Sequence, residues 1–128
     1  VPPPILIVMS DLPLITSQKI NEVISSPEDI VLAPGKKGGT NMIFLRRSKN
    51  FRVDYYGLSF FKHLRIAEER GLSVRIYDSF FASCDIDEPD DLIELLIHGR
   101  GMSTRYLRDI GLSIGIKNGL PVLARYVK

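Results

Sequence analysis

Several features that define whole classes of protein are absent from this sequence. It has a single cysteine, which excludes an intrachain disulfide framework and indicates a reducing compartment. No apolar run approaches the ~18 residues that a membrane-spanning helix needs. The start, Val1-Pro2-Pro3-Pro4, has neither the charged region nor the cleavage site of a secretory signal peptide. We therefore expect a cytoplasmic protein without a membrane partner.

An excess of charge of one sign is also lacking. The 17 basic residues nearly balance the 15 acidic ones, and they are scattered apart from Lys36-Lys37 and Arg46-Arg47. Without a polybasic stripe interleaved with aromatic residues, nucleic acid is a poor candidate partner. The hydrophobic content of 45% and the charged content of 25% are typical of a globular protein. The length of 128 residues predicts a single domain over residues 1–128.

The stretch from Ile5 to Leu14 is the point around which the rest is organised. Five apolar residues run without alternation from Ile5 to Met9, which is typical of a strand covered on both faces. Pro13 cannot donate to a strand ladder, so the strand should end by Leu12. The pattern favours an inner strand of a parallel sheet, with Asp11 at its carboxyl end, where open α/β sheets bind ligands. An isolated Asp at such a place is also explained as the start of a turn.

Helices and strands alternate after this first strand, which predicts an α/β fold with three layers and a mostly parallel sheet. Thr16 is a candidate N-cap for a helix that Pro27 closes. Ser59 is the candidate N-cap of a second helix, which ends at Gly71. The other expected elements are strands from Ile30 to Ala33, Met42 to Leu45 and Val74 to Tyr77, and a helix from Pro89 to Gly99.

The tail, residues 100–128, departs from this alternation. A helix is expected from Ser103 to Ile110, and strand-like runs then flank Asn118-Gly119, a dipeptide typical of a type I′ hairpin. Isolated hairpins are marginal in water, so one face should pack against another surface. We expect that surface to belong to a second copy in a homodimer; the competing interpretation is that the tail covers the edge of its own sheet. The apolar residues expected in this hairpin include Ile114, Ile116, Leu123, Tyr126 and Val127.

An acidic pair supplies the first candidate site. Asp85 and Asp87 lie two apart in an extended segment, so their side chains point to one face. If that segment ends beside Asp11, carboxylates crowd together, and two such charges ~4 Å apart repel by on the order of 4 kcal/mol at an effective dielectric of ~20. A divalent cation or a raised pKa must offset this repulsion. Ligands that are all oxygens favour Mg²⁺.

Neighbouring acidic residues have plainer explanations. Asp90 and Asp91 suit the first turn of a helix, where carboxylates complement the helix dipole. Glu88 is a candidate N-cap of that helix. For Asp87 taken alone, a structural and a functional explanation are equally good.

A polar loop and a helix start supply the second and the third candidate sites. The loop from Gly35 to Asn41 has three glycines, two lysines and a threonine, which suits the close approach of an anion. It is not a Walker loop, because the required Gly-Lys-Ser/Thr spacing is missing. Gly57-Leu58-Ser59 begins a helix whose amino end can also bind an anion. Taken separately, a surface turn and an N-cap explain the two stretches. His63 is more typical of a packed or solvated helix residue than of a catalytic base, and Cys84 is typical of a small buried side chain.

Together these stretches resemble one family, the 2-phospho-L-lactate guanylyltransferases of coenzyme F-420 biosynthesis. The matches keep their order from Ile5 to about Gly99. The resemblance implies a nucleotidyltransferase fold related to nucleotide-diphospho-sugar transferases and glycosyltransferase type A domains. It implies Mg²⁺-dependent transfer of GMP from GTP to 2-phospho-L-lactate, or to phosphoenolpyruvate in some relatives, with release of pyrophosphate. The matching stretches are Ser10-Asp11-Leu12-Pro13-Leu14, Gly38-Gly39-Thr40-Asn41, Tyr56-Gly57 with Ser59 and His63, and Asp85-Ile86-Asp87 followed by Pro89 and Asp91-Leu92.

The resemblance also implies roles for individual residues. Asp11 and one acid of the pair Asp85 and Asp87 would hold Mg²⁺, with Asp11 and Asp87 as the catalytic acids. Thr40, Gly57 and Ser59 would hold the acceptor's phosphate. The whole substrate-binding set would be Gly39, Thr40, Asn41, Gly57 and Ser59.

Two departures from the family pattern leave other interpretations open. The family has an N-terminal portion with a basic GTP-binding loop ahead of the Ser-Asp-Leu-Pro strand, and nothing here matches it. Many relatives also have a longer insert where only Leu58 separates Gly57 from Ser59. The alternatives are a nucleotidyltransferase for another phosphorylated acceptor and a non-catalytic domain for phosphate binding or assembly.

Overall fold

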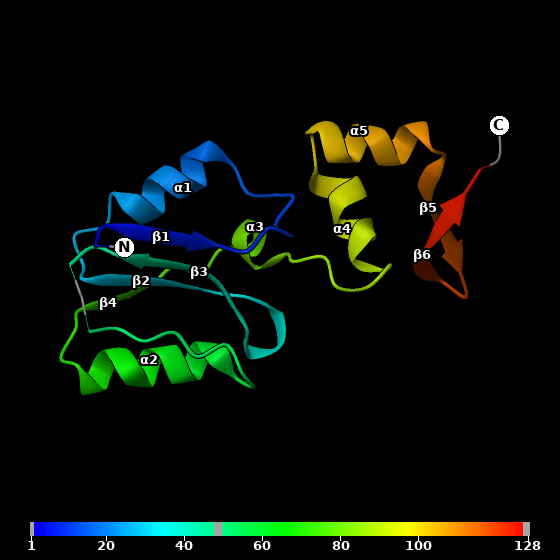
Figure 1. Ribbon diagram of the computed structural model, residues 1–128. Helices are drawn as coiled ribbons and strands as arrows, with labels where there is room; N and C mark the ends of the chain where they lie inside the picture. The colour runs from blue at the N-terminus through cyan, green and yellow to red at the C-terminus, as the bar shows by residue number, and fades with distance from the viewer. Residues whose placement is uncertain (1, 48–49, 127–128) are drawn as a thin grey trace.

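A four-stranded sheet in the order β1-β3-β2-β4 forms the centre of the computed structural model, which describes residues 2–47 and 50–126 (Figure 1). β3 runs antiparallel to both β1 and β2, whereas β2 runs parallel to β4. The strands are β1 (Ile5–Val8), β2 (Ile30–Pro34), β3 (Thr40–Leu45) and β4 (Val74–Ile76).

The prediction of a mostly parallel sheet is wrong, because β2–β4 is the one parallel ladder among the described strands. Only residues 35–39 join β2 to β3, and Lys36–Gly38 of this link form a 3-10 turn, η1. Parallel neighbours need a crossover of roughly a dozen or more residues. A link this short makes the two strands antiparallel, and its length could be read from the sequence.

β1 is an edge strand within the described part of the chain, so the prediction of an inner strand is also wrong. Its unbroken apolar run is nevertheless explained. Leu6 and Val8 pack into the cluster on one face of the sheet, while Ile5 and Ile7 pack into the cluster on the other. Coverage of both faces makes every position of a strand apolar, but this pattern carries no information about how many strands lie beside it.

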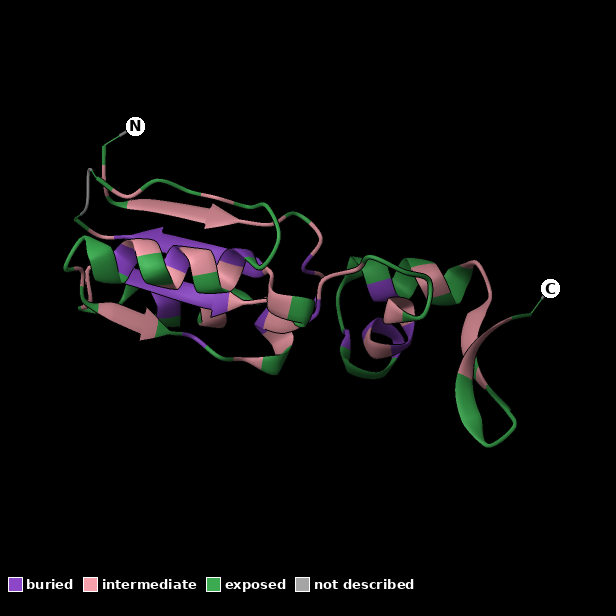
Figure 2. Cartoon of the chain, turned by 90° about the horizontal axis from the view of Figure 1, so that it is seen from below, coloured by how far each residue is buried: buried purple, intermediate pink, exposed green. Residues whose placement is uncertain are grey.

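Helices cover both faces of the sheet, which confirms the three-layer arrangement (Figure 1). α1 (Ser17–Ile24) and the short α3 (Phe80–Ser83) lie on one face, where Val23 and Ala82 join a buried cluster. α2 (Ser59–Glu69) lies on the other face. Burial is concentrated in the two central strands, as Figure 2 shows.

Two helix starts use their hydroxyl side chains differently. Thr16 is the N-cap of α1, as predicted, and its hydroxyl accepts the Lys19 amide at 3.4 Å. Ser59 is not an N-cap, because Leu58 holds that position and Ser59 is the first residue inside α2. The Ser59 hydroxyl is therefore available to Thr40, with which it forms a hydrogen bond.

The C-terminal part of the chain lies beside the sheet unit and not on its faces (Figures 1 and 2). It consists of α4 (Asp91–His98), α5 (Met102–Asp109), β5 (Leu112–Lys117) and β6 (Leu120–Arg125). Within the residues that the structure describes, no helix combines the length and the apolar character that crossing a bilayer requires.

The predicted hairpin is confirmed, with Asn118 and Gly119 at φ angles of 52° and 74° as a type I′ turn requires. It packs against α4 and α5 and lies away from the four-stranded sheet (Figure 1). The interpretation that the tail covers the edge of that sheet is therefore wrong. Val127, which was expected in the hairpin, lies outside the described residues.

Candidate active site

Backbone hydrogen bonds join three segments that are distant in the sequence at one end of the strands of the sheet. The Met9 amide, just after β1, donates to the Asn41 carbonyl of β3 at 3.0 Å. The Ile86 amide donates to the Asp11 carbonyl at 3.1 Å. The carboxyl end of β1, the amino end of β3 and the acidic turn before α4 consequently meet at the same place.

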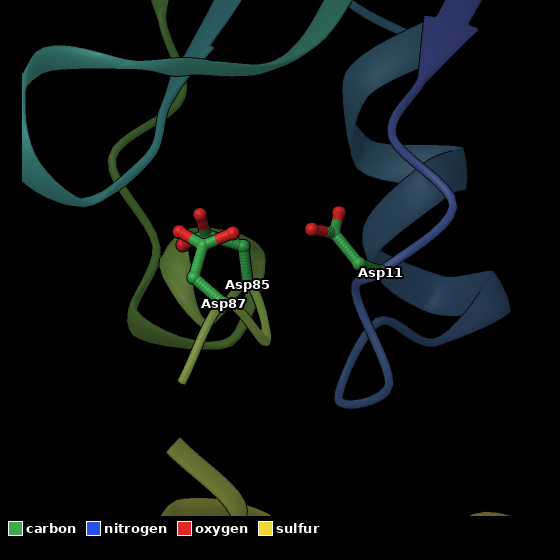
Figure 3. A group of neighbouring side chains, drawn as sticks. All are labelled: Asp11, Asp85 and Asp87. Carbon is green, nitrogen blue, oxygen red and sulfur yellow. The ribbon is translucent and has the colours of Figure 1, made fainter. Parts of the chain in front are cut away.

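Three carboxylates converge at this junction (Figure 3). One oxygen from each of Asp11, Asp85 and Asp87 lies within 4.8 Å of the other two. Asp11 extends from the segment after β1, and the other two extend from the turn that leads to α4. The structure thus brings together the three predicted metal ligands, and their binding of a metal stays a prediction.

The environment of these carboxylates fits a hard divalent cation. The Oδ1 atom of Asp85 is buried and has no hydrogen-bond partner among the residues described. A hydrogen bond with Asp85, followed by repulsion from the Asp85 and Asp11 charges, raises the pKa of Asp87 above its usual range. Buried polar atoms are normally hydrogen-bonded, and an oxygen without such a partner in a set of carboxylates is suited to bind a cation.

Asp91 has a larger role than complementing a helix dipole. One of its oxygens accepts the amides of Asp87 and Glu88 at 2.9 and 2.8 Å, and the other pairs with the Lys36 ammonium group. The Lys36 hydrogen bond and the two amides lower the pKa of Asp91 to about 2. Asp91 therefore holds the acidic turn and ties it to η1. The N-cap position of α4 belongs to Asp90 and not, as predicted, to Glu88.

A buried row of polar side chains lies between β3 and α2. The Thr40 hydroxyl lies 3.2 Å from the Ser59 hydroxyl and 2.8 Å from Nδ1 of His63. The Asp54 amide donates to Nε2 of His63 at 2.8 Å. The exposed fractions of Thr40, Ser59 and His63 are 4%, 3% and 0%, so these groups form hydrogen bonds with one another inside the protein.

His63 is packed, which is one of the two environments that the sequence left open, and it is also hydrogen-bonded at both ring nitrogens. The rings of Phe51 and Tyr55 lie with their centroids 5.8 and 5.1 Å from that of the imidazole. Burial lowers the pKa of His63, although the Asp54 charge acts in the opposite direction. The imidazole is therefore neutral at pH 7.

Two other predicted substrate-binding residues are engaged within the protein. The Gly39 amide donates to the Lys36 carbonyl at 3.2 Å, and the Gly39 carbonyl accepts the Gly35 amide at 2.8 Å. The Asn41 side chain donates to the Ala82 carbonyl at 3.0 Å and thereby links β3 to α3. A Cβ atom at Gly35 would lie 2.4 Å from the Asn41 side-chain oxygen, so glycine is needed there.

Gly57 turns the chain into α2. Its φ of 65° is in the left-handed region that favours glycine, and its carbonyl accepts the Ser59 amide at 2.9 Å. Leu58 is 58% exposed, and its Cδ2 atom would lie 2.8 Å from a Cβ on Gly38. The glycine-rich segment from Gly35 to Gly39 thus rests on the start of α2. Thr40 follows this segment directly in the chain.

Some of these relationships were missed at the sequence level. Asp54 lies in an irregular segment without periodicity, and its contribution to the row is made by its backbone amide. Lys36 and Asp91 are 55 positions apart, so no local spacing marks them as a pair. Cys84 is buried, as predicted.

The fold and the site define a class: an α/β protein with a carboxylate triad suited to a divalent cation and a hydroxyl pair suited to an anionic group. Comparison with known proteins identifies the family within that class. The sequence model described as "Guanylyl transferase CofC like" matches residues 2–127. The chain belongs to this CofC-like guanylyl transferase family, which confirms the resemblance.

Curated relatives named 2-phospho-L-lactate guanylyltransferase are similar to most of the chain. The relative from Methanoregula boonei is 54% identical over 116 residues, which cover 91% of this chain and 54% of the relative. The relative from Methanocella arvoryzae is 53% identical over 107 residues, or 84% of this chain and 49% of the relative. For Methanosphaerula palustris the identity is 50% over 121 residues, or 94% and 58%. The chain spans about half the length of the curated relatives it matches.

Proposed function

We propose that this chain supplies the metal site and the acceptor site of an enzyme that transfers GMP from GTP to 2-phospho-L-lactate. Phosphoenolpyruvate is the alternative acceptor, pyrophosphate is the second product, and the pathway is coenzyme F-420 biosynthesis. The observation that carries the proposal is that three carboxylates converge at one end of the sheet. β3 begins at the same end, with Thr40 as its first residue. The names of the relatives support the choice of substrates.

The proposed reaction needs positioning and charge neutralisation more than it needs a side-chain nucleophile. A phosphate oxygen of the acceptor attacks the α-phosphorus of GTP and forms a P–O–P bond. The bond from the α-phosphorus to the oxygen that bridges it to the β-phosphorus breaks, and that oxygen leaves with pyrophosphate. Because the acceptor's phosphate is ionised at neutral pH, it is already a nucleophile.

Asp11, Asp85 and Asp87 are the residues that would hold Mg²⁺. The unpartnered Oδ1 atom of Asp85 supports this assignment more directly than clustering alone, because exposed acidic groups often cluster without a metal. Mg²⁺ bound there would neutralise charge that develops on the phosphate oxygens. Asp91 would keep Asp87 in place, since it binds the Asp87 amide and the Lys36 side chain together.

The hydroxyls of Thr40 and Ser59 would donate to the acceptor's phosphate, and the positive φ of Gly57 would hold the start of α2 in the required position. Both hydroxyl residues are nearly buried in this structure. We therefore expect the loop from Gly35 to Gly39, which rests on the start of α2, to move when the acceptor binds.

The sheet and its helices would form part of a larger nucleotidyltransferase domain related to glycosyltransferase type A domains. The mixed sheet with helices on both faces supports this relationship. A homodimer through the hairpin completes the proposal, and it is supported by the exposure of Ile114 and Ile116, which lie on one face of the hairpin and are 37% and 81% exposed.

Product analysis tests the reaction. The protein, at its full natural length, is incubated with GTP, MgCl₂ and either 2-phospho-L-lactate or phosphoenolpyruvate, and the products are measured by liquid chromatography and mass spectrometry. We expect equal amounts of guanylylated acceptor and pyrophosphate, no product with Asp11→Asn, and normal product with Asp90→Asn. Asp90 is a matched control because its exposed carboxylate makes no capping hydrogen bond. GTP binding without product from either acceptor would contradict the proposed transfer.

A further inference from the structure

The tautomer of His63 is determined by its surroundings. Nε2 accepts the Asp54 amide, so that nitrogen carries no proton. The proton of the neutral imidazole therefore sits on Nδ1, which faces the Thr40 hydroxyl oxygen at 2.8 Å. His63 must donate to Thr40 and cannot accept from it.

The position of the proton on His63 determines how many hydroxyl hydrogens of Thr40 and Ser59 remain free to donate to another group. The contact between Thr40 and Ser59 uses one hydroxyl hydrogen, whichever residue donates it. Because His63 supplies its own hydrogen to Thr40, the second hydroxyl hydrogen of the pair is left for a partner outside the row. If His63 carried its proton on Nε2, Thr40 would donate to Nδ1 and Ser59 would donate to Thr40. Both hydroxyl hydrogens would then be consumed.

We propose that His63 is a positioning residue that keeps one hydroxyl hydrogen of the Thr40–Ser59 pair available to the phosphate group of the acceptor. This inference rests on the proposed function, in which the pair binds that phosphate. A phosphate dianion has oxygens that only accept hydrogen bonds, so it needs a donor and is repelled by hydroxyl lone pairs. The Asp54 amide and the His63 imidazole thus set the pair as a donor before the acceptor arrives.

Two substitutions separate this role from simple packing. In His63→Asn the side-chain amide can place an N–H where Nδ1–H stands, so donation to Thr40 is kept. In His63→Asp a carboxylate oxygen stands there instead, so Thr40 donates to it, Ser59 donates to Thr40, and both hydroxyl hydrogens are consumed. Both variants remove the buried ring and the acceptor of the Asp54 amide. His63→Asp also buries a charge and should melt lower, so binding is compared at a temperature at which both variants are folded.

Binding of 2-phospho-L-lactate and of GTP to each variant, measured by calorimetry, provides the test. We expect His63→Asp to weaken phospholactate binding by about 10- to 100-fold, the range for loss of a hydrogen bond to a charged group. His63→Asn should stay within about threefold of wild type, and GTP binding should be unchanged in both. In a Thr40→Val background, His63→Asp should have no further effect, because it acts through the Thr40 hydroxyl and not through its own charge. Equal losses in the two His63 variants would overturn the proposal.

The tautomer itself can be measured in the wild-type chain, so the test does not depend on the variants folding. Long-range ¹H–¹⁵N correlation spectra should show a protonated Nδ1 and an unprotonated Nε2 for His63; a protonated Nε2 would overturn the inference. If Thr40→Val and Ser59→Ala weaken phospholactate binding but His63→Asp does not, only the role of His63 fails. If these two hydroxyl variants bind phospholactate as well as wild type does, the proposed acceptor site fails, and the inference fails with it.

Discussion

Replacement of Asp85 by Asn should stabilise the metal-free protein and abolish its response to Mg²⁺. Asp85 and Asp11 each place an oxygen within 4.8 Å of the other. Two unit charges at about that distance repel by about 3 kcal/mol at an effective dielectric of ~20 and by about 1 kcal/mol in water. Both side chains are partly exposed, so we expect Asp85→Asn to raise the free energy of unfolding by about 1 to 3 kcal/mol.

Thermal unfolding followed by circular dichroism measures both effects. For a chain of this size, 1 kcal/mol corresponds to about 3 to 5 °C in melting temperature. In EDTA, Asp85→Asn should therefore melt several degrees above wild type. In MgCl₂ at ~100 times the dissociation constant, wild type should gain about 2.7 kcal/mol, whereas the variant should gain nothing. As Mg²⁺ is added, the melting temperature of wild type should therefore rise until it is close to that of the variant or above it.

Asp90→Asn is the matched control for this experiment. It removes one carboxylate from the same segment, but outside the triad, so it should leave the Mg²⁺ response intact. It should lower stability by at most about 0.5 kcal/mol through the helix dipole. A lower melting temperature for Asp85→Asn in EDTA, or a Mg²⁺ response equal to that of wild type, would refute the reasoning.

Three further predictions follow from the row of hydroxyls and from the hairpin. Thr40→Val, which is nearly isosteric, should raise the acceptor's KM by about tenfold or more in steady-state kinetics, since a hydrogen bond to a charged group is lost; a change in GTP binding instead would reassign the loop to the nucleotide. Folding stability should fall as the pH falls below 6.5, the ordinary pKa of histidine, because His63 has a lowered pKa when folded and the unfolded chain takes up the proton first. Urea unfolding between pH 7.5 and 5.5 checks this, and His63→Asn should show a weaker pH dependence. Deletion of residues 112–128 should convert a dimer into a folded monomer in light scattering, whereas a monomeric intact chain at high concentration would rule the dimer out.

The features of the fold and of the site that the sequence predicted are those with a local physical cause. Pro13 ends the first strand region, so Asp11 had to stand near the end of β1. Asn118-Gly119 adopts the positive φ angles that its turn type requires. The two-residue spacing of Asp85 and Asp87 brought both side chains to one side, where the structure places them.

The parts that the sequence could not predict depend on partners far apart in the chain. Ser59 fitted an N-cap pattern, yet its hydroxyl bonds to Thr40, which lies 19 positions earlier. His63 fitted a packed helix residue, and nothing local indicated that its two nitrogens meet Thr40 and the Asp54 amide. Asp91 likewise satisfied a simple helix-dipole explanation, which concealed its pairing with Lys36.

The most direct test of the proposed division between metal site and acceptor site is a ³¹P NMR time course with GTP, 2-phospho-L-lactate and Mg²⁺. For wild type we predict loss of the phospholactate signal and equal gains of pyrophosphate and of a new diphosphate-linked product. Asp85→Asn should form no product at any Mg²⁺ concentration, whereas Thr40→Val should recover its rate when phospholactate is raised about tenfold or more. Wild-type rates in both variants at low phospholactate would contradict the assignment of both sites.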